Sequence, residues 1–235
     1  MQSLAMAFKY LTIWGRIAHK SPRADTIGTA AVYFPVVGLC LGLLLALLNS
    51  ALSLYLAPQL LSIFLVGVLL LATGATHLDG LKNTLDGLWA SRVDAADSGK
   101  SSAASIAVIL LILLKISALD VIDDKLALSL LLTPALARWS LVIFVFGYHE
   151  RCDEDARRLA KQLRFWQLLV ITIAVLGLAA GLLGKKGLWI ALCLSVVALI
   201  GRSVLHRRHA VLTHDNFGAL IEVSETLSLI LLASL

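Results

Sequence analysis

The sequence predicts an all-α fold, a polytopic integral membrane bundle of about seven helices that forms a single membrane-embedded domain over residues 1–235. The first indication is composition: 59% of the residues are hydrophobic, 15% are charged, and the mean hydropathy is +0.90. This is too apolar for a soluble domain of this length. The second is that the apolar residues form long runs of the length that crosses a bilayer as a helix. We therefore expect the lipid bilayer to surround most of the chain.

The expected helices follow one another with short connections. Their apolar runs cover residues 31–57, 60–76, 103–119, 126–147, 167–184, 187–201 and 216–235. Several runs are short or interrupted, so six spans are the alternative to seven. The segment before the first run has Lys9 and Arg16 within apolar sequence and no small-residue cleavage site, which argues against a signal peptide.

The distribution of basic residues predicts the orientation of the bundle. Fifteen of the twenty Lys and Arg residues fall in four alternate connections. These connections are residues 1–30, 77–102, 148–166 and 202–215. Because cytoplasmic loops are enriched in Lys and Arg, we expect a cytoplasmic N-terminus in a cell inner membrane protein. The net charge of +5 then reflects topology and does not indicate a nucleic-acid partner.

A polar motif, HLDGLKNTLDGL at 77–88, follows the second apolar run. If a helix continues through it, Asp79, Asn83 and Asp86 project from one face, and the neighbouring glycines let a backbone or ligand approach. Carboxylate and amide oxygens suit a hard cation such as Mg²⁺. The alternative is a solvated segment in which Lys82 and Asp86 form a surface pair.

A second polar face lies in the last apolar run, where Asp215, Glu222 and Glu225 fall on one helical stripe. Ionised groups inside a bilayer are costly, so these carboxylates should face a polar cavity, a cation or each other. The alternative is one glutamate that pairs with the mid-span Arg138 for packing alone. Lys115, near the outer end of its span, is expected to extend its amine towards the interface.

Six segments resemble the cobalamin synthase family of adenosylcobinamide-GDP ribazoletransferases over nearly the whole chain. They are YFPVVGLCLG (33–42), HLDGLKNTLDGL (77–88), Asp97-Ser98, LLKISAL (113–119), ARW (137–139) and DNFGALIEVSE (215–225). The resemblance implies a magnesium-dependent membrane transferase that joins adenosylcobinamide-GDP to α-ribazole or its 5′-phosphate and releases GMP. It leaves the oligomeric state open, a homo-oligomer included.

The resemblance also implies roles for individual residues. It makes Asp79, Asp86 and Asp215 catalytic, and it gives four magnesium ligands: Asp79, Asn83, Asp86 and Asp215. The substrate-binding residues that it implies are His77, Asn83, Asp97, Ser98, Arg138, Glu222 and Glu225. Asp215 completes the metal site or accepts the proton of the attacking hydroxyl. For His77 alone, hydrogen bonding at a helix end is an equal alternative.

The chain departs from the family pattern at several positions. Asn83 replaces an expected aspartate, and Lys82 replaces a small residue. The loss of an anion and the gain of a cation predict weaker metal binding. Two other functions stay open at this stage: a CDP-alcohol-type membrane phosphotransferase, and a non-catalytic paralogue or ion-coupled carrier.

Overall fold

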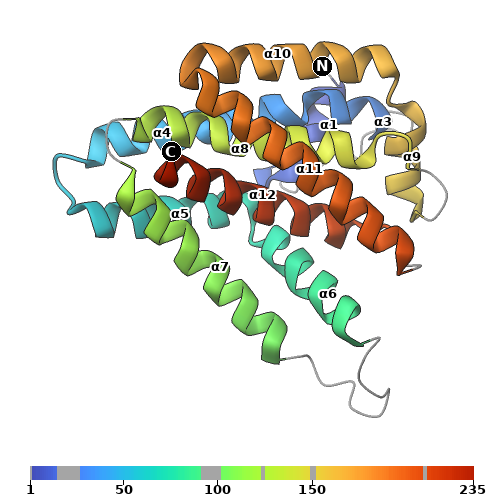
Figure 1. Cartoon of the computed structure of the whole chain (residues 1–235), viewed down its shortest axis with the longest axis horizontal. Coiled ribbons are helices and arrows are strands. Elements are labelled where there is room, and N and C mark those ends of the chain that lie inside the picture. The colour runs from blue at the N-terminus through green and yellow to red at the C-terminus, as the bar shows by residue number, and fades with distance from the viewer. Residues whose placement is uncertain (1, 15–26, 91–101, 123–124, 149–151, 209–210) are drawn as a thin grey trace.

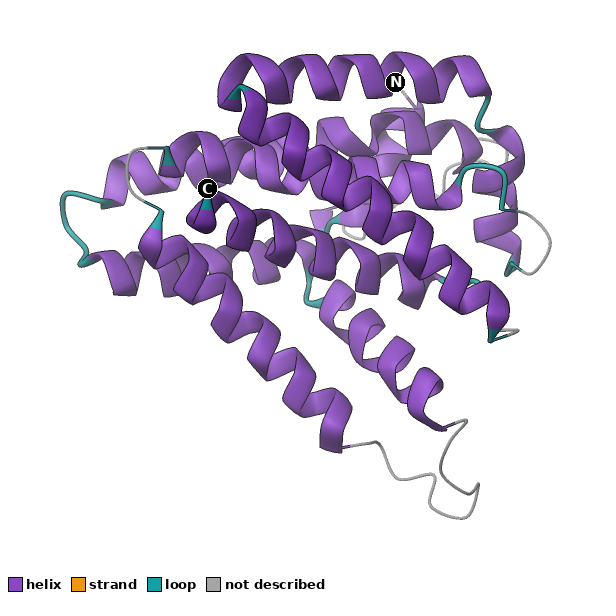
Figure 2. Cartoon of the chain, viewed as in Figure 1, coloured by secondary structure: helices purple, strands orange, loops and turns teal. Residues whose placement is uncertain are grey.

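A computed structural model describes residues 2–14, 27–90, 102–122, 125–148, 152–208 and 211–235. Within these ranges the regular elements are helices, and an isolated β-bridge joins Cys152 to Leu212 (Figure 2). The helices before the first break are α1 (Gln2–Leu11), α3 (Ile27–Ala30), η2 (Ala31–Tyr33), α4 (Phe34–Leu52), α5 (Pro58–Thr73) and α6 (Thr76–Ala90). Those that follow are α7 (Ser102–Val121), α8 (Leu126–Val145), α9 (Glu154–Gln162), α10 (Phe165–Leu183), α11 (Lys185–Arg207) and α12 (His214–Ser234).

Six helical segments of the described chain are long and apolar enough to cross a membrane, and the bent pair α5–α6 brings the number to seven. This confirms the predicted all-α membrane bundle and its six to seven spans. Two of the spans form the centre. In α8, 83% of the apolar window is buried, and in α12 the value is 61%, whereas the outer helices α7 and α10 reach 22%. The two central helices can therefore hold polar groups away from lipid.

Glycines let α4 pack directly on α8. A Cβ atom on Gly38 would lie 2.4 Å from the carbonyl oxygen of Pro134, and one on Gly42 would lie 2.2 Å from that of Leu131. Any larger residue would push the helices apart, since such contacts are shorter than van der Waals distance. Close backbone approach through small residues is the usual way in which membrane helices associate.

The second apolar run does not continue as one helix into the polar motif. Helix α5 ends at Gly74 and Ala75, which have φ angles of 64° and 54°, and α6 starts in a new direction at 83° to α5. Left-handed glycine is a common helix terminator, while a left-handed alanine is uncommon. The motif is still helical, so Asp79, Asn83 and Asp86 share one face as predicted. Helix α6, however, points away from the axis of α5 (Figure 1).

The helix ends form two groups at opposite ends of the bundle (Figure 1). Helices α3 and α9, the end of α11 and the start of α12 lie at one end, whereas α6 projects outwards from the side of the bundle. The connections α4–α5, α7–α8 and α10–α11 and the end of α12 lie at the other. Apart from α6, these positions agree with the alternation that the basic residues predict. The side that faces the cytoplasm stays a prediction.

Candidate active site

The polar motifs on α6 and α12 meet through glycines. A Cβ atom on Gly80 would lie 2.6 Å from the carbonyl oxygen of Asp215, and one on Gly218 would lie 2.9 Å from the Cα atom of His77. The two backbones therefore touch, as predicted for a glycine beside Asp79. Gly87 differs, because a Cβ atom there would have no neighbour within 4 Å.

Two side-chain hydrogen bonds cross this junction. Asn83 Nδ2 donates to Asp215 Oδ2 at 3.1 Å, and Asn216 Nδ2 donates to Thr84 Oγ1 at 3.1 Å. The start of α12 is fixed by a capping box, in which the backbone N–H of Thr213 donates to Asn216 Oδ1 at 2.9 Å. The side-chain amide of Asn216 thus caps the first turn of α12 with its oxygen and holds α6 with its nitrogen. We call this contact region of α6 and α12 the α6–α12 junction.

A pocket of about 310 Å³ opens beside the junction. Its polar lining comprises Asn83, Thr84, Arg208, Thr213, Asp215 and Asn216. The N-terminus of α12 lies in this lining, and a helix N-terminus favours anions. Because Arg208 also lines the pocket, its positive charge lies close enough to favour a phosphate group next to a carboxylate and an amide.

The two aspartates of the α6 motif do not line this pocket. Asp79 is exposed. Asp86 pairs with Lys82, whose Nζ lies 2.9 Å from Asp86 Oδ2, and both side chains are 25% exposed. The surface-pair interpretation is therefore confirmed for Lys82 and Asp86. A pair of this kind contributes only about 0–1 kcal/mol, so a ligand could displace it at little cost.

The four predicted magnesium ligands are not gathered around one point. Among the described residues, no group of three or more His, Cys, Asp or Glu side chains is placed to hold a metal ion. Asn83 and Asp215 are in contact, and the oxygen donors of the motif suit Mg²⁺ in type. The donor set fits the ion, and the magnesium site stays a prediction.

Four charged side chains form a second polar region deeper in the bundle, which we call the inner charge cluster. Lys115 Nζ lies 2.6 Å from Glu222 Oε2 and 2.7 Å from Glu225 Oε2, and Arg138 donates to the other carboxylate oxygen of Glu225. Their side chains are 0–2% exposed. Expecting Lys115 to reach the interface was therefore wrong, because two carboxylates hold its amine inside.

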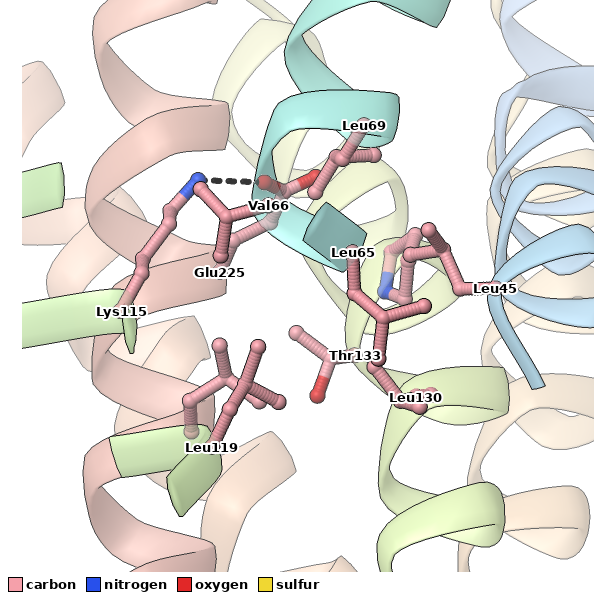
Figure 3. A pocket seen from close by; sticks show the side chains of 11 residues that line it. Leu45, Leu65, Val66, Leu69, Lys115, Leu119, Leu130, Thr133 and Glu225 are labelled. Atoms are coloured by element: carbon pink, nitrogen blue, oxygen red, sulfur yellow. Dashed lines mark hydrogen bonds and ion pairs between the residues drawn. The ribbon is translucent and has the colours of Figure 1, made fainter. Parts of the chain in front are cut away.

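The inner charge cluster does not line the pocket beside the α6–α12 junction. Lys115 and Glu225 border a separate cavity of about 20 Å³, whose other walls are mostly leucine and which includes Thr133 (Figure 3). This volume admits about one water molecule. Both glutamates face cations, which is one of the arrangements predicted from the sequence. The predicted pairing of a glutamate with Arg138 is confirmed for Glu225. Their role in binding substrate stays a prediction.

The remaining predicted residues behave differently. His77 is 1% exposed, and neither ring nitrogen has a hydrogen-bond partner among the described residues. The hydrogen-bonding interpretation of His77 is therefore not supported. Asp97 and Ser98 lie outside the described residues.

Sequence reasoning missed four polar residues of the pocket: Thr84, Arg208, Thr213 and Asn216. Two of them carried a signal, since a threonine followed three residues later by a polar side chain is a helix-start pattern. Arg208 belongs to a basic stretch whose charge topology alone explains, so the sequence does not mark it as a pocket residue.

A family model described as cobalamin-5-phosphate synthase matches residues 3–233. The chain belongs to the cobalamin-5-phosphate synthase family. The matched region includes the residues of α6 and α12 that form the junction.

Individual relatives from this family extend over nearly the full chain. An adenosylcobinamide-GDP ribazoletransferase of Stutzerimonas stutzeri is 33% identical, covering 99% of this chain and 98% of the relative. One of Geotalea daltonii is 32% identical, covering 91% and 89%. One of Pseudomonas fluorescens is 31% identical, covering 90% of each. No solved structure matches the chain.

Proposed function

We propose that the protein is an adenosylcobinamide-GDP ribazoletransferase. In this reaction a ribose hydroxyl of α-ribazole, or of its 5′-phosphate, attacks the phosphorus that carries the cobinamide group. A new phosphorus–oxygen bond forms, the pyrophosphate bond breaks, and GMP leaves. The family match supports the reaction class. The observation that carries the assignment of the site is the contact of Asp215 with Asn83 beside a polar pocket.

The pocket supplies the groups that this substrate needs. A pyrophosphate requires positive charge around its oxygens, and Arg208 and the N-terminus of α12 provide it. Phosphoryl transfer otherwise depends on positioning and on charge stabilisation. The α6–α12 junction, held by two hydrogen bonds and by glycine contacts, offers a fixed wall against which the reacting phosphorus can lie.

We further propose that magnesium binds at this wall. Asn83 and Asp215 would hold it, with Asp79 and Asp86 as the other ligands from the same face of α6. When bound, the ion would neutralise the charge of the pyrophosphate. Asp86 would then leave Lys82, which is a small cost for an exposed pair.

Two alternatives have less support. A CDP-alcohol phosphotransferase would need a DG-x-x-A-R element followed by G-x-x-x-D-x-x-x-D, which the sequence lacks. An ion-coupled carrier would use charged groups inside the bundle, but two cations and two carboxylates already pair there. The family match favours neither of them.

The side with α6 and α9 is proposed to face the cytoplasm of a cell with an inner membrane. Cysteines introduced at positions 91 and 123, both outside the described residues, should react with a charged thiol reagent from opposite faces of sealed vesicles. Reaction from the same face would refute the topology.

The proposed reaction is tested with purified protein in nanodiscs, adenosylcobinamide-GDP, α-ribazole and magnesium, with GMP as the measured product. The Asp215→Asn variant should release GMP roughly a hundredfold more slowly, because charge stabilisation at such a site is worth several kcal/mol. Glu154→Gln is the matched control, since Glu154 is 79% exposed on α9 at the same end of the bundle. Wild-type protein that released no GMP would refute the proposal.

A further inference from the structure

The inner charge cluster connects three helices through charged hydrogen bonds. Lys115 comes from α7, Arg138 from α8, and Glu222 and Glu225 from α12. Its two cations balance its two carboxylates, and all four side chains are almost fully buried. Removing any one of the four side chains would leave the cluster with a net charge inside the bundle. The ion pairs therefore constrain the positions of α7, α8 and α12 relative to one another.

Apolar burial alone does not fix the rotation of α12. Between Asn216 and Leu229 it is buried on nearly every side, so no lipid-facing stripe distinguishes one face from another. It packs against α6, α7, α8 and α11. Charged hydrogen bonds require specific distances and angles, so they can fix the rotation of a helix that is buried all round.

The face of α12 that carries Glu222 and Glu225 also carries Asp215, which lines the pocket. Asp215 lies seven residues before Glu222 and ten before Glu225, which correspond to about 10 Å and 15 Å along the helix. Turning α12 by one residue, about 100°, would take Glu222 away from Lys115 and Asp215 away from Asn83 together. The contact of Lys115 with two successive turns of α12 fixes both rotation and height.

We propose that Lys115 is a positioning residue for the active site. By binding Glu222 and Glu225 together, it sets the rotation and axial position of α12 and thereby holds Asp215 against α6. The effect of Lys115 on catalysis rests on the proposed function. Its effect on the geometry of the α6–α12 junction does not.

The geometry is measured with two spin labels across the pocket, on cysteines that replace Gly87 and Val211, after the three native cysteines have been replaced. Both positions line the pocket, and Val211 is 55% exposed. We expect Lys115→Met to broaden the distribution of label distances and Lys115→Arg to restore most of it. Thr133→Val is the control at the same cavity: its hydroxyl has no partner among the described residues, and the distribution should stay as in the wild type.

Catalysis gives the second readout on the unlabelled protein. A displacement of about 1 Å at a reacting group can lower the rate about a hundredfold. We therefore expect Lys115→Met to lower kcat for GMP release by about that factor, with less than about a twofold change in KM for adenosylcobinamide-GDP. Lys115→Arg should recover most of kcat.

A double variant covers the case in which Lys115→Met does not fold. Lys115→Met with Glu222→Gln removes one charge of each sign, and neutral replacement of a buried ion pair is often tolerated. This variant should regain the wild-type thermal midpoint but keep the broad distribution. If a folded variant without Lys115 gives the wild-type distribution, the positioning role is wrong. If wild-type protein releases no GMP, the proposed function fails, while the label distances still decide the role of Lys115.

Discussion

Asp215 and Glu225 lie on the same face of α12, yet their surroundings give them opposite properties. Asp215 accepts one hydrogen bond from the neutral amide of Asn83 and borders an open pocket. Glu225 is 1% exposed and binds two cations from two other helices. A carboxylate with a neutral partner can still take up a cationic ligand, whereas one with two cations is already neutralised. The sequence of α12 alone does not distinguish these two carboxylates, because their surroundings come from residues of α6, α7 and α8.

The largest expected difference between the two regions is in stability. Glu225→Gln should lower the free energy of unfolding by about 3–5 kcal/mol, because Lys115 and Arg138 would lose the anion between them. Reversible unfolding in detergent micelles measures it. Asp86→Asn, which breaks the exposed pair with Lys82, is the control and should cost about 0–1 kcal/mol. Equal losses in the two variants would contradict the distinction.

The stability of the α6–α12 junction should depend on side-chain size, whereas that of the inner charge cluster should depend on charge. Gly80→Ala adds a methyl group 2.6 Å from the backbone of Asp215, so the helices must move apart. We expect a loss of about 1–3 kcal/mol in stability, as for other overpacked sites, and a clear fall in GMP release. Gly67→Ala on α5 has open space around it and serves as the control. It should keep both stability and activity.

A smaller effect is expected from Asn83→Asp, which changes the charge of the junction without changing its shape. Two carboxylates would then lie where a 3.1 Å hydrogen bond stands, and their repulsion should lower the thermal midpoint when magnesium is absent. Because a carboxylate is a stronger ligand than an amide, the magnesium concentration for half-maximal activity should fall. An unchanged magnesium requirement would place Asn83 outside the metal site.

The fold was largely predictable because apolar runs report helices directly. The spans and their alternation follow from run length and from the basic connections. The break at Gly74 and Ala75 was not predictable, since a left-handed alanine is unfavourable locally. It persists in a packed environment, where the N–H of Ile13 donates to the carbonyl of Ala72 at 3.0 Å.

The sequence predicted which polar residues share a helix face better than it predicted which residues they contact on other helices. Spacing along the chain placed the polar residues of α6 and α12 on single faces, and the structure brings Asn83 and Asp215 together. Spacing could not show which way Lys115 points, because α7 is apolar all round and no face of it is marked as inward. Nor could it show Arg208 in the pocket, since that depends on the path between α11 and α12.

The central claim is that α6 and α12 form one magnesium-dependent site, and the most direct test is the thermal shift that magnesium produces. An ion that binds the folded state raises the thermal midpoint. Asp79→Ala, Asp86→Ala and Asp215→Ala should each reduce this shift, and the double variants should be little worse than the single ones, because the ligands act as a unit. If Asp215→Ala kept the full shift while Asp79→Ala lost it, the two helices would not share a metal.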